Sequence, residues 1–293
     1  MMLNAQTKLA AKRDRHVGLT VYRMAAYIFL TLISFLCLFF FYILIVNATR
    51  AHSEIQTGFS FLPGRNLASN WKAMLQNDQL PMWNGIFNSL TVSTLTALLA
   101  TYFSALTAHA VHVYDFKLKN FAFQFILLVM TVPSQVVTLG FLRQISSWGW
   151  MDSYLPLVLP AISSPIVFFF MKQYMESTLP LEIVEAARID GSGEFSTFNR
   201  IVLPIMKPAI AVQAIFTFVS SWNNYFMPAL IIKSASKKTL PILIAQLRSA
   251  DWLKFDMGQV YMAIALAILP IIIVYLGLSR FIVRGVTLGS VKG

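Results

Sequence analysis

The chain is poor in charged residues and in cysteine. Only 12% of its 293 residues are charged, and there is a single cysteine. Soluble domains carry about 25% charged residues, so this composition excludes an ordinary soluble enzyme and a disordered tail. One cysteine excludes a disulfide-stapled secreted module. The net charge is +11, but no basic block is dense enough to indicate a nucleic-acid partner.

The sequence also lacks the common motifs of catalysis and cofactor binding. It contains no GxxxxGK[ST], no HExxH, no GxSxG and no paired-cysteine spacing. We therefore predict that this chain holds no metal, no cofactor and no catalytic residue, and that it does not bind ATP through a phosphate loop.

Long uncharged runs are what the sequence has instead. The composition is 57% hydrophobic, and a helix needs about 20 apolar residues to cross a bilayer. The runs are too long and too continuous for barrel strands. They predict an all-α integral membrane protein, a single transmembrane domain over residues 24–293, with six transmembrane helices at 24–46, 86–111, 120–142, 153–171, 208–232 and 259–279.

Orientation rests on the residues before the first run. Cytoplasmic flanks of membrane helices are enriched in Lys and Arg. Residues 1–23 are therefore predicted to be a cytoplasmic N-terminal segment, and six crossings put the C-terminus in the cytoplasm as well. The basic residues of this segment are Lys8, Lys12, Arg13, Arg15 and Arg23.

No charged residue falls inside the six predicted membrane cores. Ion-coupled carriers usually keep ionisable groups at mid-membrane, so this absence counts against a self-sufficient secondary carrier or channel, which stays the alternative hypothesis. A membrane enzyme would need reactive groups gathered at one depth, and the sequence shows none.

Small residues recur every fourth position in the second run. Thr96, Ala100, Ser104 and Ala108 share one helix face, which permits close approach of a neighbouring helix. A moving interface and static packing both fit this pattern.

The segment between the fourth and fifth runs, residues 172–207, reads as two short helices joined by a turn. Pro180 suits a first helical turn, and Gly191 supplies the left-handed position that ends a helix. Apolar residues from Phe195 to Ile205 follow at helical spacing. Such a segment exposes apolar side chains without a core of its own, which predicts docking into a groove of a partner.

This segment also carries a family motif. Glu185-Ala186-Ala187, then Gly191, then Ile201, Leu203 and Pro204 match the EAA motif at every fixed position. The chain thus resembles the permeases of binding-protein-dependent ABC importers. The resemblance implies that the segment docks into the ATP-hydrolysing subunit, with coupling residues Glu185, Ala186, Ala187, Arg188, Gly191, Ile201, Leu203 and Pro204.

Two other stretches resemble the carbohydrate branch of this family. They are residues 221–228 and the ending 285–293, which is similar to that of the smaller maltose-transporter permease. The resemblance implies a bacterial inner-membrane location and four kinds of partner. These are a second homologous permease, a dimer of ATP-binding subunits that holds ATP and Mg²⁺, an extracytoplasmic solute-binding protein, and membrane lipid.

Polar and aromatic residues of the fifth run are candidates for the substrate path. Gln213, Thr217, Ser220 and Asn224 would share one face of a continuous helix, and Trp222, Tyr225 and Phe226 could stack on a sugar. Hydrogen bonding between helices, worth about 0.6–2 kcal/mol per pair, explains the polar residues equally well. The candidates are Gln135, Gln213, Thr217, Ser220, Trp222, Asn223, Asn224 and Tyr225, with serines 134, 163 and 164 as further possibilities.

The predicted outer loop 233–258 is net basic. Three interpretations stay open: an ordinary solvated loop, a contact with an acidic patch of the solute-binding protein, or attraction of an acidic sugar. The resemblance implies an oligosaccharide or polysaccharide substrate, and the charge of this loop leaves open whether that substrate is neutral or acidic. The basic residues are Lys233, Lys237, Lys238, Arg248 and Lys254.

Overall fold

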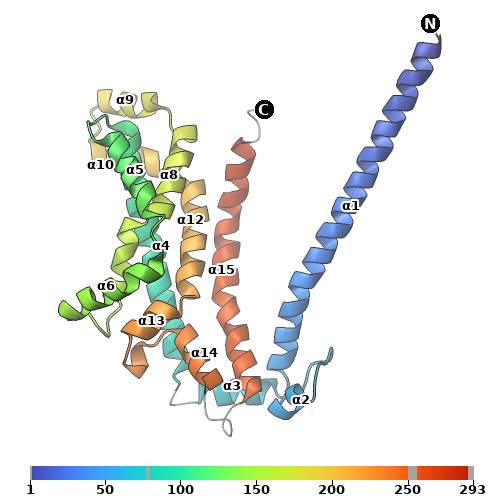
Figure 1. Ribbon diagram of the computed structural model, residues 1–293, viewed down its shortest axis with the longest axis vertical. Helices are drawn as coiled ribbons and strands as arrows, with labels where there is room; N and C mark the ends of the chain where they lie inside the picture. Colours follow the sequence, from blue (N-terminus) through green and yellow to red (C-terminus); the bar gives the residue numbers. More distant parts are fainter. Residues whose placement is uncertain (1, 77–79, 250–255, 290–293) are drawn as a thin grey trace. The chain divides into compact units, whose positions relative to one another are not determined.

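The computed structural model describes residues 2–76, 80–249 and 256–289 (Figure 1). Within these ranges every regular element is a helix, and none is a strand. The side chains of the ending 285–293 and of Arg248 and Lys254 lie outside the described residues, as does the side chain of Ser134. The predicted all-α class is confirmed for the part of the chain that is described.

Contacts separate the chain into two compact units, where the sequence predicted one domain. The first unit comprises residues up to 71 together with 257–265, and the second comprises 72–256 and 266 onward. The first holds α1 (Met2–Ala48), α2 (His52–Gln56), the start of α3 (Leu67–Leu75) and the start of α15 (Met257–Gly289).

The second unit contains the remaining elements. They are α4 (Met82–Val113), α5 (Lys119–Val129), α6 (Ser134–Ser147), α7 (Leu155–Val158), the 3₁₀ turn η1 (Leu159–Ser163), α8 (Pro165–Thr178), α9 (Leu181–Ile189), α10 (Glu194–Thr197), the π-helical turn η2 (Phe198–Val202), α11 (Leu203–Ile205), α12 (Lys207–Trp222), α13 (Phe226–Ile231), the 3₁₀ turn η3 (Ala235–Lys237) and α14 (Leu240–Ser249).

Fewer continuous spans are present than the sequence predicted. Among the described residues, four helical segments are long and apolar enough to cross a membrane, or five if a pair bent by 79° is counted as one span. The four are Tyr22–Ala48, Met82–Val113, Leu155–Thr178 and Met257–Ser279, and the bent pair is Glu194–Ile205 with Lys207–Trp222.

Two predicted spans are wrong as continuous helices. The run 120–142 is broken between Val129 and Ser134, since proline disfavours the helical conformation of the residue before it and Pro133 cannot donate a backbone hydrogen bond. The run 208–232 ends its main helix at Trp222, and a short helix resumes at Phe226.

In the first unit, a buried cluster of polar residues, Asn47, Arg50 and Asn70, holds the chain where it leaves α1. Arg50 is 7% exposed, and its guanidinium donates to Asn47 Oδ1 at 3.2 Å and to the carbonyl of Gly58 at 2.9 Å. Asn70 donates from Nδ2 to the carbonyls of Ala48 and Arg50, both at 2.9 Å. These bonds satisfy backbone groups that a helix end leaves without partners.

In the second unit, α4 is the central helix. It packs against α8 and α12, and the buried side chains on it are mostly small. Of the predicted small-residue face, Ala100, Ser104 and Ala108 are buried. Small side chains let helix backbones approach closely, which favours dispersion contacts in lipid.

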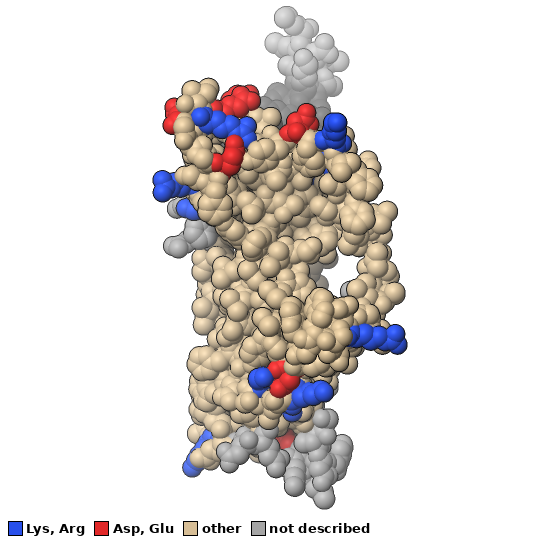
Figure 2. All heavy atoms as spheres, turned by 90° about the vertical axis from the view of Figure 1, so that its left-hand side faces the viewer, with Lys and Arg blue, Asp and Glu red and all other residues tan. Residues whose placement is uncertain are grey.

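Charged side chains are unevenly distributed over this unit. On the face drawn in Figure 2, Lys, Arg, Asp and Glu gather toward two ends, and the surface between them is almost entirely uncharged. An uncharged band between charged ends is typical of a surface that faces lipid.

A substitution at Gly64 tests the packing around this polar cluster. A Cβ there would lie 2.5 Å from the carbonyl oxygen of Thr49 and 2.8 Å from Cα of Arg50. Because both atoms belong to backbone, Gly64→Ala is expected to destabilise the protein by about 1–3 kcal/mol. Thermal melting of the purified protein in detergent measures this, with Gly277→Ala, whose Cβ meets nothing within 4 Å, as control. Equal melting temperatures for the two variants would contradict the packing described.

Candidate functional sites

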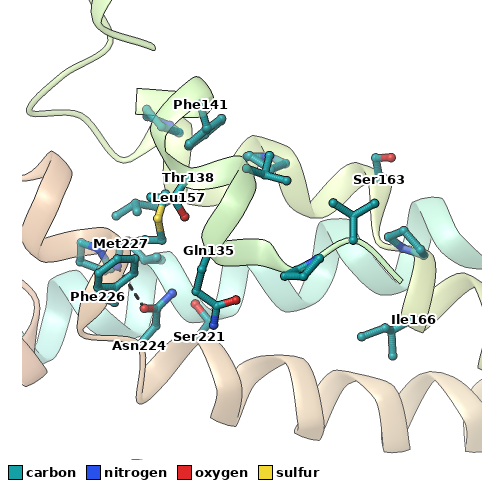
Figure 3. A pocket seen from close by; sticks show the side chains of 18 of the residues that line it. Gln135, Thr138, Phe141, Leu157, Ser163, Ile166, Ser221, Asn224, Phe226 and Met227 are labelled. Carbon is teal, nitrogen blue, oxygen red and sulfur yellow. Dashed lines mark hydrogen bonds between the residues drawn. The ribbon is translucent and has the colours of Figure 1, made fainter. Parts of the chain in front are cut away.

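A cavity of about 1150 Å³ lies within the second unit (Figure 3). Its walls come from α4 and from three places where the helical run is interrupted or tightened: the α5–α6 break, the turn η1, and the break between α12 and α13. Non-helical backbone at membrane depth is tolerated where it lines a cavity, and broken membrane helices commonly form substrate sites.

The lining of this cavity is uncharged and mostly apolar, with polar side chains set among the apolar ones. None of its described lining residues is Asp, Glu, Lys, Arg or His. Hydroxyls and amides share the wall with prolines and with Phe141 and Phe226, which offer apolar faces. The polar lining residues are Ser89, Ser93, Thr131, Gln135, Thr138, Ser163, Ser221, Asn224 and Thr239.

Two buried hydroxyls in the wall have no hydrogen-bond partner within the described protein. Ser93 is 1% exposed and Thr239 is 3% exposed, and the Oγ of Ser93 and the Oγ1 of Thr239 are both unpaired. A buried hydroxyl without a partner costs about 1–3 kcal/mol. Both oxygens are closed off from solvent, so they are unpaired polar groups behind the surface of the wall and are not open to a guest.

Only part of the predicted substrate-path set reaches this cavity. Gln135 and Asn224 line it, from α6 and from the break after α12, and so do two further possibilities, Ser163 and Phe226 (Figure 3). Asn224 lies beyond the end of α12, so the assumption of a continuous helical face through residue 224 is wrong. Its Oδ1 accepts a long hydrogen bond of 3.4 Å from the backbone N–H of Met227.

The other candidates lie elsewhere. Trp222 is 2% exposed, stacks on Phe218 at 5.8 Å between ring centres, and donates from Nε1 to the carbonyl of Ala267 at 3.1 Å, so its ring is used in packing. Gln213 is 7% exposed and does not line the cavity. Four further candidates are partly or fully exposed but outside the lining: Thr217, Ser220, Asn223 and Tyr225.

Sequence reasoning missed Ser93, Thr138 and Ser221. For Thr138 and Ser221 the signal was a neighbouring interruption rather than their own spacing, and Ser93, in the middle of α4, had no such signal. Val132-Pro133 and Ser164-Pro165 each place a residue before proline inside an apolar run, and Ser164 is indeed extended, with φ −101° and ψ 100°.

The EAA loop, residues 172–207, is built around the turn at Gly191. Its φ is +78°, the left-handed conformation that only glycine adopts without strain. The N–H of Ser192 donates to the carbonyl of Ala187 at 2.9 Å, which closes α9 in the way that helix-ending glycines do. Pro180 is the N-cap of α9, one residue before its predicted place in the first turn.

The loop has a core, contrary to the sequence prediction. Val184, Phe198 and Val202 are 0% exposed and pack into one cluster with residues of α4 and α8. Of the apolar spacing that suggested a docking face, Phe198 and Val202 therefore face the bundle, whereas Phe195 stays exposed. The apolar side chains that remain exposed are on the other side, led by Ile189 at 85% and Phe195 at 69%.

The motif residues divide between the two sides of the loop. Glu185, Ala186 and Pro204 are exposed, whereas Ala187 is buried. Ile201 and Leu203 are half-buried, and Leu203 packs against the cluster with α4 and α8.

A charged cluster joins the loop to the end of α4. Arg188 donates from Nε and Nη2 to the two carboxylate oxygens of Glu194 at 2.7 and 3.2 Å, and the hydroxyl of Tyr114 donates to Glu194 Oε2 at 2.5 Å. The guanidinium also lies 5.4 Å from the centre of the Tyr114 ring. Hydrogen bonds from Arg188 and Tyr114 lower the pKa of Glu194, and the bond to Glu194 raises the pKa of Tyr114.

At the opposite end of this unit, Asp152 fixes the 233–239 loop. Its carboxylate accepts hydrogen bonds from the N–H groups of Lys233 and Ser234, both at 2.9 Å, and pairs with Lys237 at 3.3 Å. Hydrogen bonds from Ser234 and Lys233 hold the pKa of this carboxyl well below its usual range. Lys237 therefore does not act as an unpaired positive charge.

Comparison with known proteins decides the family. Residues 97–288 match the binding-protein-dependent transport system inner membrane component. The chain belongs to this family. It is a multi-pass permease component, and the predicted resemblance is confirmed.

Individual relatives agree with this assignment. The arabinooligosaccharides permease protein AraQ of Bacillus subtilis is 34% identical over 94% of this chain and 97% of its own length. The sn-glycerol-3-phosphate permease protein UgpE of Yersinia enterocolitica is 32% identical, over 85% of this chain and 90% of its own. A crystal structure of a bacterial ABC transporter that imports the acidic polysaccharide alginate shares the fold, with a TM-score of 0.76, 18% identity, and coverage of 89% of this chain and 96% of the other.

Gly191 provides a test of the EAA turn in this permease. Gly191→Ala is expected to strain the turn by about 1–2 kcal/mol, because a β-carbon disfavours the left-handed conformation. Gly193→Ala is the matched control, since Gly193 has a φ of −68° and neither added Cβ meets an atom within 4 Å. We expect substrate-stimulated ATPase activity of the assembled transporter to fall in the first variant only. Equal activity in both would show that the backbone of this turn does not matter.

Proposed function

We propose that this chain is one of two permease subunits of an ATP-driven ABC importer for an uncharged oligosaccharide. In this proposal the cavity is its half of the substrate path, and the EAA loop couples it to the ATPase. The family assignment supports an importer permease. The relatives named for arabino-oligosaccharides and for lactose (the LacG permease protein of Rhizobium radiobacter, 28% identical over 91% of this chain and 95% of its own length) support a carbohydrate.

The absence of charged residues from the described cavity lining is the reason for proposing a neutral substrate. Moving an anion into a low-dielectric cavity requires a compensating positive charge, because unpaired buried charge is very costly. The described lining has none, and instead presents hydroxyls, amides and apolar faces that match sugar hydroxyls and sugar rings. The pairing of Lys237 with Asp152 also weakens the alternative of an acidic sugar attracted by the outer loop.

The size of the cavity fits this class of substrate. Pockets for drug-sized ligands are about 300–1,000 Å³, and this one is slightly larger at about 1150 Å³. A substrate of at least two sugar units is therefore favoured.

The remaining parts of the proposal concern topology and partners. The chain crosses the bacterial inner membrane six times, with broken helices counted as crossings, and both termini are in the cytoplasm. A homologous permease completes the path, a solute-binding protein delivers the sugar, and a dimer of ATPase subunits binds ATP and Mg²⁺. The chain itself performs no chemistry and contacts membrane lipid but no nucleic acid.

The proposal is tested by reconstituting the complex. The tagged chain is co-expressed with its chromosomal neighbours, purified in mild detergent and placed in liposomes with the solute-binding protein. We expect ATP-dependent uptake of neutral oligosaccharides and no uptake of oligouronates. Uptake of oligouronates would overturn the neutral class. Uptake by the chain alone, without ATP or an ATPase, would support the self-sufficient carrier instead.

Two adjacent asparagines test the cavity. Asn224 lines it and Asn223 does not, although both are exposed amides at the end of α12. Asn224→Ala is expected to raise the KM for uptake about fivefold, the loss of one hydrogen bond worth about 1 kcal/mol. Asn223→Ala is expected to leave it unchanged. A larger effect at Asn223 would place the substrate path elsewhere.

A further inference from the structure

The EAA loop and α4 are joined by contacts of two kinds. Apolar contacts of Val184, Phe198 and Val202 bury the loop against the bundle, and Tyr102 of α4 donates a neutral hydrogen bond to Asn199 Oδ1 at 3.2 Å. Apolar contact is non-directional, so it holds the loop against α4 without fixing its orientation.

The cluster of Tyr114, Arg188 and Glu194 adds charged, directional bonds to the hydrogen bond of Tyr102 and to the 3.0 Å contact of His112 Nε2 with the carbonyl of Leu179. A bidentate Arg–carboxylate pair has a fixed planar geometry, and a hydroxyl donated to the same carboxylate adds a third fixed bond. Arg188 lies in the last turn of α9 and Glu194 is the first residue of α10, so the pair spans the Gly191 turn. The three bonds therefore join α9, α10 and the end of α4 at one carboxylate.

Tyr114 is rigidly connected to α4. It is the C-cap of that helix, and its N–H donates to the carbonyl of Ala110 at 3.2 Å. The ring of His109, buried at 3% exposure, packs 6.1 Å from the ring of Tyr114 and 5.4 Å from that of Phe198. The Tyr114 side chain is thus attached to α4, the same helix against which the apolar residues of the loop pack.

The same helix lines the cavity. α4 is continuous from Met82 to Val113, and Ser89 and Ser93 on it face the cavity. At 1.5 Å per residue, about 30 Å of unbroken helix separates Ser93 from Tyr114. A displacement of the loop that reaches Tyr114 is therefore carried along α4 to the cavity wall.

We infer that Tyr114, Glu194 and Arg188 form a lock that makes α4 follow the EAA loop during the ATPase cycle. The three are positioning residues, and the inference rests on the proposed importer function. The lock also reassigns Arg188. The resemblance implied that Arg188 couples the loop to the ATPase subunit, whereas here its guanidinium is held by Glu194 of the same chain.

The first test removes one hydroxyl. Tyr114→Phe keeps the ring beneath Arg188 but loses the bond to Glu194. In liposomes containing the complete complex, we expect the sugar taken up per ATP hydrolysed to fall about three- to tenfold, as for loss of one solvent-exposed hydrogen bond worth about 1 kcal/mol. Tyr154→Phe is the matched control, because Tyr154 also donates a hydrogen bond, to the carbonyl of Lys237 at 3.0 Å, but far from the loop. Its ratio is expected to stay within about twofold of wild type.

The second test exchanges the charges. Arg188→Glu and Glu194→Arg each place like charges across the Gly191 turn and are expected to lower the uptake per ATP more than Tyr114→Phe does. The double variant R188E/E194R restores an attractive pair and is expected to recover at least half of the loss of the worse single variant. A general loss of folding would not be rescued by exchanging the two charges.

The outcomes separate the lock from the proposed function. A wild-type complex that hydrolyses ATP but moves no sugar would contradict the proposed function. Sugar uptake at the wild-type ratio in Tyr114→Phe, or a double variant no better than its singles, would overturn the lock alone. Loss of the ATPase subunit from the variant complexes in gel filtration would also overturn it, since the cluster would then serve assembly and not transmission.

Discussion

The positions of the helix breaks in the second unit follow from one constraint: in an apolar solvent, backbone hydrogen-bonding groups must find partners within the protein. Continuous helices meet this requirement by themselves, so interruptions are affordable only where other groups or a polar space are at hand. The α5–α6 break, the turn η1 and the α12–α13 break all border the same cavity. The substrate path proposed for this permease thus lies beside the breaks between helices, and not along the face of any single helix.

The long unbroken helix α4 has a different role, which is to transmit movement. α4 is held on one side by α12 and on the other by α8, with small buried residues at the contacts. Close packing of this kind leaves few intermediate arrangements, so a helix so packed moves as a unit or not at all. For this reason, a hydrogen bond made by Tyr114 at one end of α4 can affect the position of the Ser93 hydroxyl in the cavity wall.

The sequence was sufficient for the helical class, for the long apolar helices and for the left-handed turn at Gly191, because these depend on local composition and on one residue's backbone freedom. It was insufficient where a short interruption outweighs many apolar neighbours, as at Pro133, or where apolar spacing does not tell which partner it faces. Phe198 and Val202 have the periodicity of a docking face, yet they are buried in the chain's own bundle.

The cavity and the charged cluster could be predicted even less well. Asn223 and Asn224 are chemically identical neighbours, and only the end of α12 one residue earlier decides which of them reaches the cavity. Tyr114 and Glu194 are 80 residues apart, and nothing in either local sequence connects them. Such contacts are properties of the assembled fold.

The unbroken course of α4 has a consequence for how this protein can change over generations. Each residue of an α-helix turns the next by about 100°, so inserting or deleting one residue between Ser93 and Tyr114 would rotate one end by that angle relative to the other. The cavity hydroxyls or the tyrosine would then face the wrong neighbours. The sequence of α4 can drift, but its length between these two points cannot, and gains or losses of residues should be confined to the turns on either side.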